Sequence, residues 1–179
     1  MSVRPFLNKE PTIPSSTYVD PEATVIGDVI LGEDCSIWPR AVIRGDVNFI
    51  RIGHRTNIQD QCVFHVNHNA TFNPGGDPLI LGNDVTVGHG VLLHGCEIQN
   101  ECLIGMGSIV MDKVVIESQV MLGAGSLVPR GQVLKQGYLY LGRPATQIRL
   151  LTEEELAFLP YSAAHYVELK NQYLTPKLS

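Results

Sequence analysis

The sequence predicts a mainly β protein in which short parallel strands wind into a solenoid, with helices at the C-terminal end. Three observations predict this fold class. Aliphatic residues recur at steps of six, a small or β-branched residue follows most of them four positions later, and glycine often comes directly after the aliphatic residue. A step of six does not fit the helical period and suits a short strand followed by a turn. Repeats of this length are typical of parallel β-helices.

The repeat is defined by two series of residues. The aliphatic positions are Leu31, Ile37, Ile43, Ile52, Ile58, Phe64, Leu81, Val87, Leu93, Ile98, Ile104, Val110, Ile116, Leu122 and Val128. The small positions are Cys35, Ala41, Val47, Thr56, Cys62, Val85, Val91, Cys102, Ser108, Val114, Val120 and Ser126. Three hexads are expected to form one triangular coil, with the aliphatic side chain inside, the small one beside a corner and glycine in the corner backbone. The pattern resembles the left-handed parallel β-helix of the hexapeptide-repeat superfamily, and that resemblance implies the left hand.

The extent of the repeat predicts how the chain is divided. Residues 1–14 are expected to form an N-terminal extension, 15–150 the β-helix and 151–179 a C-terminal helical segment. Three extra residues fall around 49–51, and an insertion at 69–78 contains proline and paired glycine, so we expect a protruding loop at this insertion. Insertions of this kind lie on a solenoid face that is often functional.

The C-terminal segment is expected to contain two helices that pack along the outside of the prism. Residues 152–155 form a capping box, Thr-Glu-Glu-Glu, which marks the start of the first helix. Pro160 is expected to end this helix, and a second one is expected from Ser162 to about Tyr173. The predicted apolar stripe of the second helix is Tyr166, Val167, Leu169 and Tyr173.

The composition argues against several classes of protein. The 179 residues carry a net charge of −5 without a basic run, so nucleic acid is not an expected partner. No membrane span is expected, because no apolar run reaches ~18 residues. The N-terminus lacks the apolar stretch of a signal peptide, so a cytoplasmic location is expected. Cys35, Cys62 and Cys102 occupy small repeat positions and are expected to be buried thiols, rather than a disulfide or metal ligands.

Counting the hexads in threes places Arg44, His65 and His94 in one column on the same face of successive coils. Neighbouring strands lie about 4.8 Å apart. Ring nitrogens of His65 and His94 could therefore both reach one metal ion at about 2.0–2.1 Å. A lone histidine on a strand is more often a hydrogen-bonded surface residue, but a pair in register favours a metal site.

His89 lies off this column, because it follows Val87 on the preceding face of the coil that carries His94. It is not expected to reach the pair within its own subunit. A cyclic trimer could bring His89 of one subunit to His65 and His94 of the next, so the geometry predicts an obligate homotrimer with the metal shared between adjacent subunits. Three neutral nitrogen ligands with an open fourth position are typical of catalytic zinc, with Fe²⁺ or Co²⁺ as alternatives.

The motifs around these histidines resemble those of the gamma-class carbonic anhydrases, in the same order along the chain. They are Arg44-Gly45-Asp46, Thr56-Asn57-Ile58-Gln59-Asp60, His65, and His89-Gly90-Val91-Leu92-Leu93-His94. The match covers roughly residues 15 to 150. The resemblance implies a homotrimer with zinc bound at each subunit interface by His65, His94 and a neighbour's His89. It also implies reversible hydration of carbon dioxide to bicarbonate by metal-bound hydroxide.

The resemblance further implies roles for five polar residues. Gln59 would hydrogen-bond the hydroxide or the substrate, and Arg44 and Asp46 would pair across the subunit boundary. Asn57 and Asp60 would support these groups. Gln59 and Asn57 could instead bond corner backbone, and the pair of Arg44 and Asp46 could be structural rather than catalytic.

The chain departs from the family pattern at two positions. The best-known active members carry a glutamate directly after the Arg-Gly-Asp motif, where this chain has Val47. They also carry a second glutamate, three residues after the first histidine, in an acidic loop that shuttles protons. At that position this chain has His68, followed by a loop whose single acid is Asp77. His68 could shuttle protons, because imidazole titrates near neutral pH, or it could be a solvated loop residue. These departures bear on the rate rather than on metal binding.

Three alternatives to carbon dioxide hydration follow from the same residues. A metal-dependent hydrolase could act on thioesters or other small acyl compounds, because an activated hydroxide attacks any suitably placed carbonyl. A trimeric scaffold could carry a silent site. A hexapeptide acyltransferase would need no zinc triad, so the three histidines argue against it.

Overall fold

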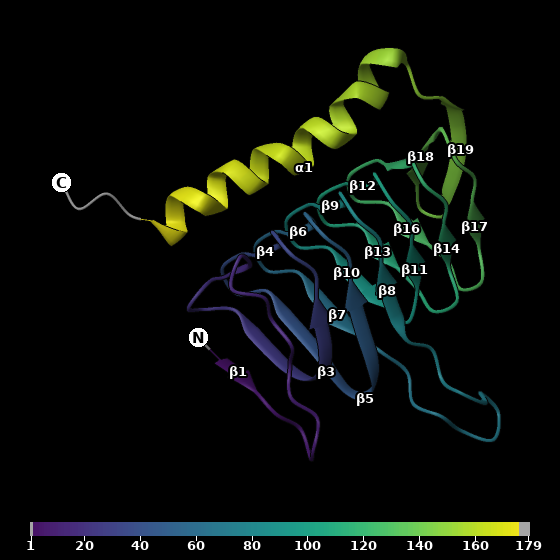
Figure 1. Ribbon diagram of the computed structural model, residues 1–179. Helices are drawn as coiled ribbons and strands as arrows, with labels where there is room; N and C mark the ends of the chain where they lie inside the picture. The colour runs from purple at the N-terminus through teal and green to yellow at the C-terminus, as the bar shows by residue number, and fades with distance from the viewer. Residues whose placement is uncertain (1, 176–179) are drawn as a thin grey trace.

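The computed structural model describes residues 2–175, which form a solenoid of short parallel strands followed by one long helix (Figure 1). Equivalent strands of successive coils pair in parallel, and the pairing defines three faces. The mainly β solenoid class predicted from the six-residue period is therefore confirmed.

The strands of each face follow one another in the order of their pairing. The first face contains β16 (Leu127–Val128), β13 (Ile109–Val110), β10 (Leu92–His94), β7 (Val63–His65) and the beginning of β5 (Val42–Ile52). The second face contains the end of β5, then β8 (Leu79–Leu81), β11 (Glu97–Ile98), β14 (Val115–Ile116) and β17 (Val133–Leu134). The third face contains β2 (Tyr18–Val19), β4 (Ser36–Ile37), β6 (Asn57–Ile58), β9 (Thr86–Val87), β12 (Leu103–Ile104), β15 (Met121–Leu122), β18 (Tyr138–Gly142) and β19 (Ala145–Leu150).

Both ends of the solenoid are covered by additional strand pairs. At the N-terminal end, β1 (Ser2–Arg4) pairs in parallel with β3 (Thr24–Leu31), which in turn pairs with β5. At the C-terminal end, β19 folds back on β18 as an antiparallel hairpin. The predicted N-terminal extension thus contributes a strand to the solenoid.

The side chains in the series of aliphatic repeat positions fill the interior of the solenoid. Every member of that series is buried, with no more than 4% of its surface exposed. Burying each such side chain contributes about 1.5–3 kcal/mol to folding. The small positions are buried beside the corners as predicted, except for Val47, which is 46% exposed.

Val47 is exposed because β5 bulges at this point. The pairing of β3 with β5 runs from Gly27 opposite Gly45 to Val29 opposite Ile50. One residue separates the paired positions on β3, whereas residues 46–49 separate them on β5, so β5 carries the three extra residues that interrupt the hexads. The bulge turns residues 46–49 away from the prism interior.

The glycines that follow the aliphatic residues do not have the role we predicted. The left-handed backbone at the corners belongs to other residues, such as Asp34 and Arg55, with φ of 59° and 54°. The repeat glycines instead allow the coils to stack closely. A Cβ on Gly53 would lie 2.5 Å from the carbonyl carbon of Gly82, and one on Gly105 would lie 2.5 Å from the backbone nitrogen of Ala124.

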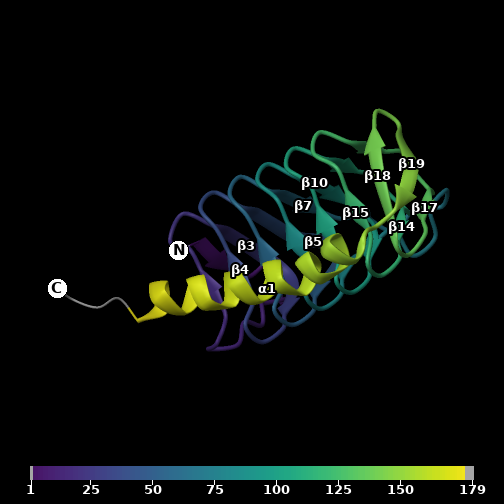
Figure 2. The same cartoon turned by 90° about the horizontal axis from the view of Figure 1, so that it is seen from above.

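The C-terminal segment forms one helix rather than two. The helix α1 (Glu153–Leu174) runs through Pro160 and back along the third face toward the N-terminal coils (Figures 1 and 2). The capping box at Thr152 is present, as predicted. Buried side chains lie on both sides of the proline, and their packing on the prism offsets the roughly 3 kcal/mol that an interior proline costs. These buried residues are Leu159, Ser162, Ala163 and Lys170.

The predicted stripe of α1 faces the prism. Tyr166, Val167 and Leu169 are half-buried. Tyr173 is more exposed, but its ring lies 5.2 Å from that of Trp38 and 5.3 Å from that of Tyr18. No helix in the described part of the chain combines the length and the apolar character that crossing a membrane requires.

All four cysteines are free and buried. This confirms the prediction for Cys35, Cys62 and Cys102, and Cys96 is buried although it does not occupy a small repeat position. Burial raises the pKa of Cys35 to about 11 and that of Cys62 and Cys102 to about 12. It also raises the pKa of the Cys96 thiol.

Candidate metal centre

The strands β7 and β10 place His65 and His94 side by side on the first face of the prism. Their Cα atoms are paired in the parallel register, as the face count predicts. The aliphatic residues before them, Phe64 and Leu93, point inward and are fully buried. The alternation of a strand turns both histidines outward. The ring centroids are 5.1 Å apart, and Nδ1 of His65 lies 3.1 Å from Nε2 of His94.

Each of the two rings is held by a carboxylate through its other nitrogen. Nε2 of His65 lies 3.0 Å from Oδ1 of Asp46, and Nδ1 of His94 lies 2.6 Å from Oδ1 of Asp112. When these nitrogens donate their protons to the carboxylates, the two nitrogens that face each other carry lone pairs. Lone pairs at this separation repel each other unless a cation binds both.

The donor set fits a divalent metal. Two ligands of a tetrahedral zinc ion, each about 2.05 Å from the metal, are about 3.3 Å apart. The observed 3.1 Å between the facing nitrogens is close to that value. Histidine ligands usually donate their second ring proton to a carboxylate or carbonyl, which is the arrangement of both rings here.

Asp46 reaches His65 because the β5 bulge carries it there. Arg44 contacts the second oxygen of this carboxylate. Burial opposes ionisation of Asp46, but the hydrogen bonds from Arg44 and His65 outweigh it and hold the pKa of the carboxyl below its usual range. Burial lowers the pKa of His65 despite the opposing effect of Asp46, which keeps the ring neutral at pH 7. The pair of Arg44 and Asp46 forms within one chain, whereas the resemblance implies a pair across the subunit boundary.

Asp112 contacts His94 at this site, and we did not predict this contact from the sequence. It lies two residues after Val110, which pairs with Leu93 on the neighbouring coil. The same count of hexads places it beside His94, but the sequence is equally consistent with a solvated aspartate at the corner. Only its 2.6 Å contact with the imidazole distinguishes it.

His89 lies on a different part of the prism, in the turn after β9 on the third face. Its side chain is 51% exposed, and Nδ1 lies 2.8 Å from Oδ2 of Asp60. The neighbouring carboxylate again leaves Nε2 as the nitrogen that can bind a ligand. Among residues 2–175, no group of three His, Cys, Asp or Glu side chains within one chain could hold a metal ion. The structure therefore brings together His65 and His94 and leaves His89 apart from them, as the face count predicts.

Gln59 and Asn57 lie beside His89 on the third face. Nε2 of Gln59 donates to Oδ1 of Asn57 at 3.2 Å, and Nδ2 of Asn57 donates to Oγ1 of Thr86 at 3.0 Å. Both amide side chains are therefore bonded to side chains, rather than to corner backbone. Thr86 in turn lies 3.0 Å from Oγ of Ser162 on α1, and neither hydroxyl residue is marked by a sequence motif.

His68 and Val47, the two departures from the family pattern, are both exposed. His68 is at the start of the protruding segment between β7 and β8, three residues after His65. The antiparallel bridges of Asn67 with Asp77 and of Ala70 with Asn73 hold that segment in a hairpin-like loop. Asp77, the single acid of the loop, is buried and lies 3.6 Å from Nζ of Lys113, so it is not a solvent-exposed acid.

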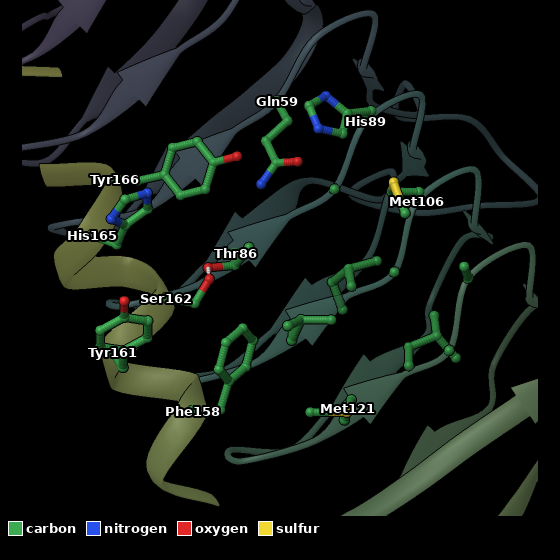
Figure 3. A pocket seen from close by; sticks show the side chains of 17 residues that line it. Gln59, Thr86, His89, Met106, Met121, Phe158, Tyr161, Ser162, His165 and Tyr166 are labelled. Atoms are coloured by element: carbon green, nitrogen blue, oxygen red, sulfur yellow. Dashed lines mark hydrogen bonds between the residues drawn. The ribbon is translucent and has the colours of Figure 1, made fainter. Parts of the chain in front are cut away.

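A cavity of about 610 Å³ lies between α1 and the third face, with Gln59 and His89 at its wall (Figure 3). Its lining is mostly apolar, with Leu103, Met106 and Met121 from the prism and Phe158 from the helix. Tyr161, His165 and Tyr166 add aromatic rings from α1.

Comparisons with known proteins agree with this fold. Residues 10–45 match the family model described as bacterial transferase hexapeptide (six repeats). A solved structure of a hexapeptide transferase family protein from Anaplasma phagocytophilum superimposes with a TM-score of 0.90 at 41% identity, and the match covers 96% of this chain and 98% of that one. The chain thus belongs to the hexapeptide-repeat superfamily.

Individual relatives of known name show which group within this superfamily the chain resembles. Protein YrdA of Escherichia coli is 54% identical over 96% of this chain and 94% of its own length. A carbonic anhydrase of Geobacillus kaustophilus is 43% identical over 96% of this chain and 90% of its own. The mitochondrial gamma carbonic anhydrase 1 of Arabidopsis thaliana is also 43% identical, over 90% of this chain and 58% of its own. Within the superfamily, the chain belongs to the gamma carbonic anhydrase-like proteins.

Proposed function

We propose that this protein is a gamma-class carbonic anhydrase that hydrates carbon dioxide reversibly, with zinc held between the subunits of a homotrimer. Fe²⁺ or Co²⁺ suits the same donors. The observation that carries the proposal is the orientation of three histidines by three aspartates, Asp46, Asp60 and Asp112. When the nitrogen beside each aspartate carries the ring proton, the other nitrogen keeps its lone pair, so the chain offers three nitrogen donors.

A divalent metal bound to these nitrogens would lower the pKa of water and so make hydroxide available at neutral pH. The chain's own residues provide the rest of the site. The three aspartates would hold the ring protons on the nitrogens that do not bind the metal. Gln59 keeps Oε1 available as a hydrogen-bond acceptor, because its Nε2 already donates to Asn57. The apolar wall of the neighbouring cavity suits an uncharged substrate such as carbon dioxide.

The positions of the histidines on two faces support the proposed trimer. His65 and His94 lie on the first face and His89 follows a strand of the third, so one chain supplies both halves of the site at different places. Val63 and Leu92 are paired on the first face beside the histidine pair and are 42% and 38% exposed. An apolar strip at this place favours burial against a second subunit. A cyclic arrangement of three chains completes three such sites.

A second candidate function is favoured by the size of the cavity beside Gln59 and His89. Its volume of about 610 Å³ lies in the range of small-molecule sites and exceeds what carbon dioxide needs. An apolar lining of this size suits the acyl group of a thioester or ester. Hydrolysis of such a compound at the same metal is therefore the alternative activity, and a scaffold without catalysis is the third possibility.

The first experiment measures metal per chain in protein purified anaerobically, together with proton release from carbon dioxide by stopped flow. The parent should bind metal and hydrate carbon dioxide, whereas His94→Ala should lose both. A parent without metal would contradict every metal-based function. Metal without hydration would reject carbonic anhydrase and leave the acyl hydrolase, which short-chain thioesters would test, or the scaffold.

The second experiment tests whether the site is shared. His89→Ala and His94→Ala chains should each bind no metal alone. When the two are unfolded, mixed in equal amounts and refolded, a mixed cyclic trimer contains one interface with all three histidines, so about one quarter of the sites should bind metal. A site within one chain would recover no metal on mixing.

A further inference from the structure

We propose that Ser162 on α1 sets the direction in which the Gln59 amide points, acting through Thr86 and Asn57. The consequence for catalysis rests on the proposed function, whereas the direction of the amide does not. The four side chains form one continuous chain of hydrogen bonds from the helix to the cavity wall: Ser162 to Thr86 at 3.0 Å, Thr86 to Asn57 at 3.0 Å, and Asn57 to Gln59 at 3.2 Å.

The whole chain of bonds is buried. Asn57 is 1% exposed, and Thr86, Gln59 and Ser162 are each 8% exposed or less. A buried polar atom without a hydrogen-bond partner is unfavourable, so these groups rotate together to keep every bond satisfied. Figure 3 shows the contact of Thr86 with Ser162, with Gln59 beside His89.

The hydroxyl proton of Thr86 decides the direction in which the hydrogen bonds between Ser162 and Gln59 run. When Thr86 donates this proton to Ser162, its oxygen is the acceptor for Nδ2 of Asn57. Oδ1 of Asn57 then accepts from Nε2 of Gln59. The atom that Gln59 offers to the cavity is therefore Oε1, an acceptor.

Loss of the Ser162 hydroxyl reverses this order. The proton of Thr86 then has no acceptor on α1 and turns to Asn57, which rotates its amide to present Oδ1. Nδ2 of Asn57 now faces Gln59, whose amide rotates in response. Gln59 offers Nε2, a donor, to the cavity. Ser162 is thus a positioning residue that acts through Gln59.

The direction of this amide matters for the proposed reaction. A hydroxide has one proton to donate, and an acceptor at Oε1 binds that proton and leaves the oxygen lone pairs free to attack. A donor at the same place would bind the oxygen itself and reduce its reactivity. Ser162→Ala should therefore lower kcat about tenfold and leave KM unchanged.

The first test does not depend on activity. Hydrogen exchange of the Gln59 side-chain amide can be followed by NMR in metal-free protein with ¹⁵N-labelled glutamine, and Gln59→Ala assigns the signal. In the parent, one amide proton is bonded to buried Asn57 and should exchange slowly. In Ser162→Ala the amide faces the cavity and should exchange at least about tenfold faster, while Ser162→Thr, which keeps the hydroxyl, should restore slow exchange. Unchanged exchange in Ser162→Ala would overturn the proposal, even if the parent proves not to hydrate carbon dioxide.

The second test asks whether Ser162 acts through Gln59. In a double-mutant cycle, Ser162→Ala should lower kcat in the parent and have no further effect in Gln59→Ala. Independent, multiplying losses would contradict a positioning role, as would a loss of metal in Ser162→Ala.

Discussion

Oδ1 of Asp112 lies 2.6 Å from Nδ1 of His94, on the side of the ring opposite to His65. This contact favours the ring proton on Nδ1 of His94 and so leaves the lone pair on Nε2, the nitrogen that faces His65. Asp112 lies on the following coil, and no motif in the sequence marks it. The proposed centre therefore depends on a residue that stacking of the coils brings into place.

We expect Asp112→Asn to weaken metal binding by 10- to 100-fold, because an amide no longer stabilises the proton on Nδ1 of His94. Competition of the metal with a chromophoric chelator would measure this. The matched control is Asp84→Asn, which removes a carboxylate that pairs with Arg55 and should leave metal affinity unchanged. Equal metal affinity in the parent and in Asp112→Asn would show that the contact of Asp112 with His94 does not affect metal binding.

The second prediction concerns His68. If its imidazole carries protons away from the site, His68→Ala should lower the turnover of carbon dioxide in weak buffer, and added imidazole should restore it. Stopped-flow assays at several buffer concentrations would measure the effect. His54→Ala is the control, since Nδ1 of His54 accepts a hydrogen bond from the backbone of Glu33, away from the protruding loop. A rate in weak buffer that does not respond to His68→Ala would remove this residue from the mechanism.

The third prediction concerns the thiols. Burial raises the pKa of Cys35 to about 11 and that of Cys62 and Cys102 to about 12, so the native protein should resist alkylation at pH 8 and react only when unfolded. As the pH rises from about 9 toward 11, the unfolded chain releases thiol protons that the native chain retains, so the free energy of unfolding should fall. Mass spectrometry after brief iodoacetamide treatment checks the first point. Rapid labelling of native protein would contradict the burial of these side chains.

The fourth prediction concerns Lys170, which is 1% exposed and lies 2.8 Å from Oδ1 of Asp34. Asp34→Asn should destabilise the fold by about 3 kcal/mol, because it leaves a buried ammonium without its counter-ion. Lys170→Met removes the buried charge and keeps the chain length, so its cost should be within about 1 kcal/mol. Thermal unfolding of both variants at one protein and metal concentration would compare them. A larger loss for Lys170→Met would mean that the ion pair itself stabilises the packing of α1.

The sequence by itself determined the solenoid and the relation between the histidines. The six-residue period sets which side chains point inward, and counting hexads places His65 beside His94 and sets His89 apart, because each coil stacks directly on the one before. The burial of Cys35, Cys62 and Cys102 follows from the same count.

Tertiary structure decided what the repeat does not encode. The bulge in β5 exposes Val47 and brings Asp46 to His65, because three extra residues must leave the prism. Packing on both sides of Pro160 outweighs the tendency of proline to end a helix, so α1 continues through this residue. The contacts of Asp112 with His94 and of Ser162 with Thr86 join residues from different coils or from the helix and the prism. Such contacts depend on distances across the fold, which the local pattern of the chain does not contain.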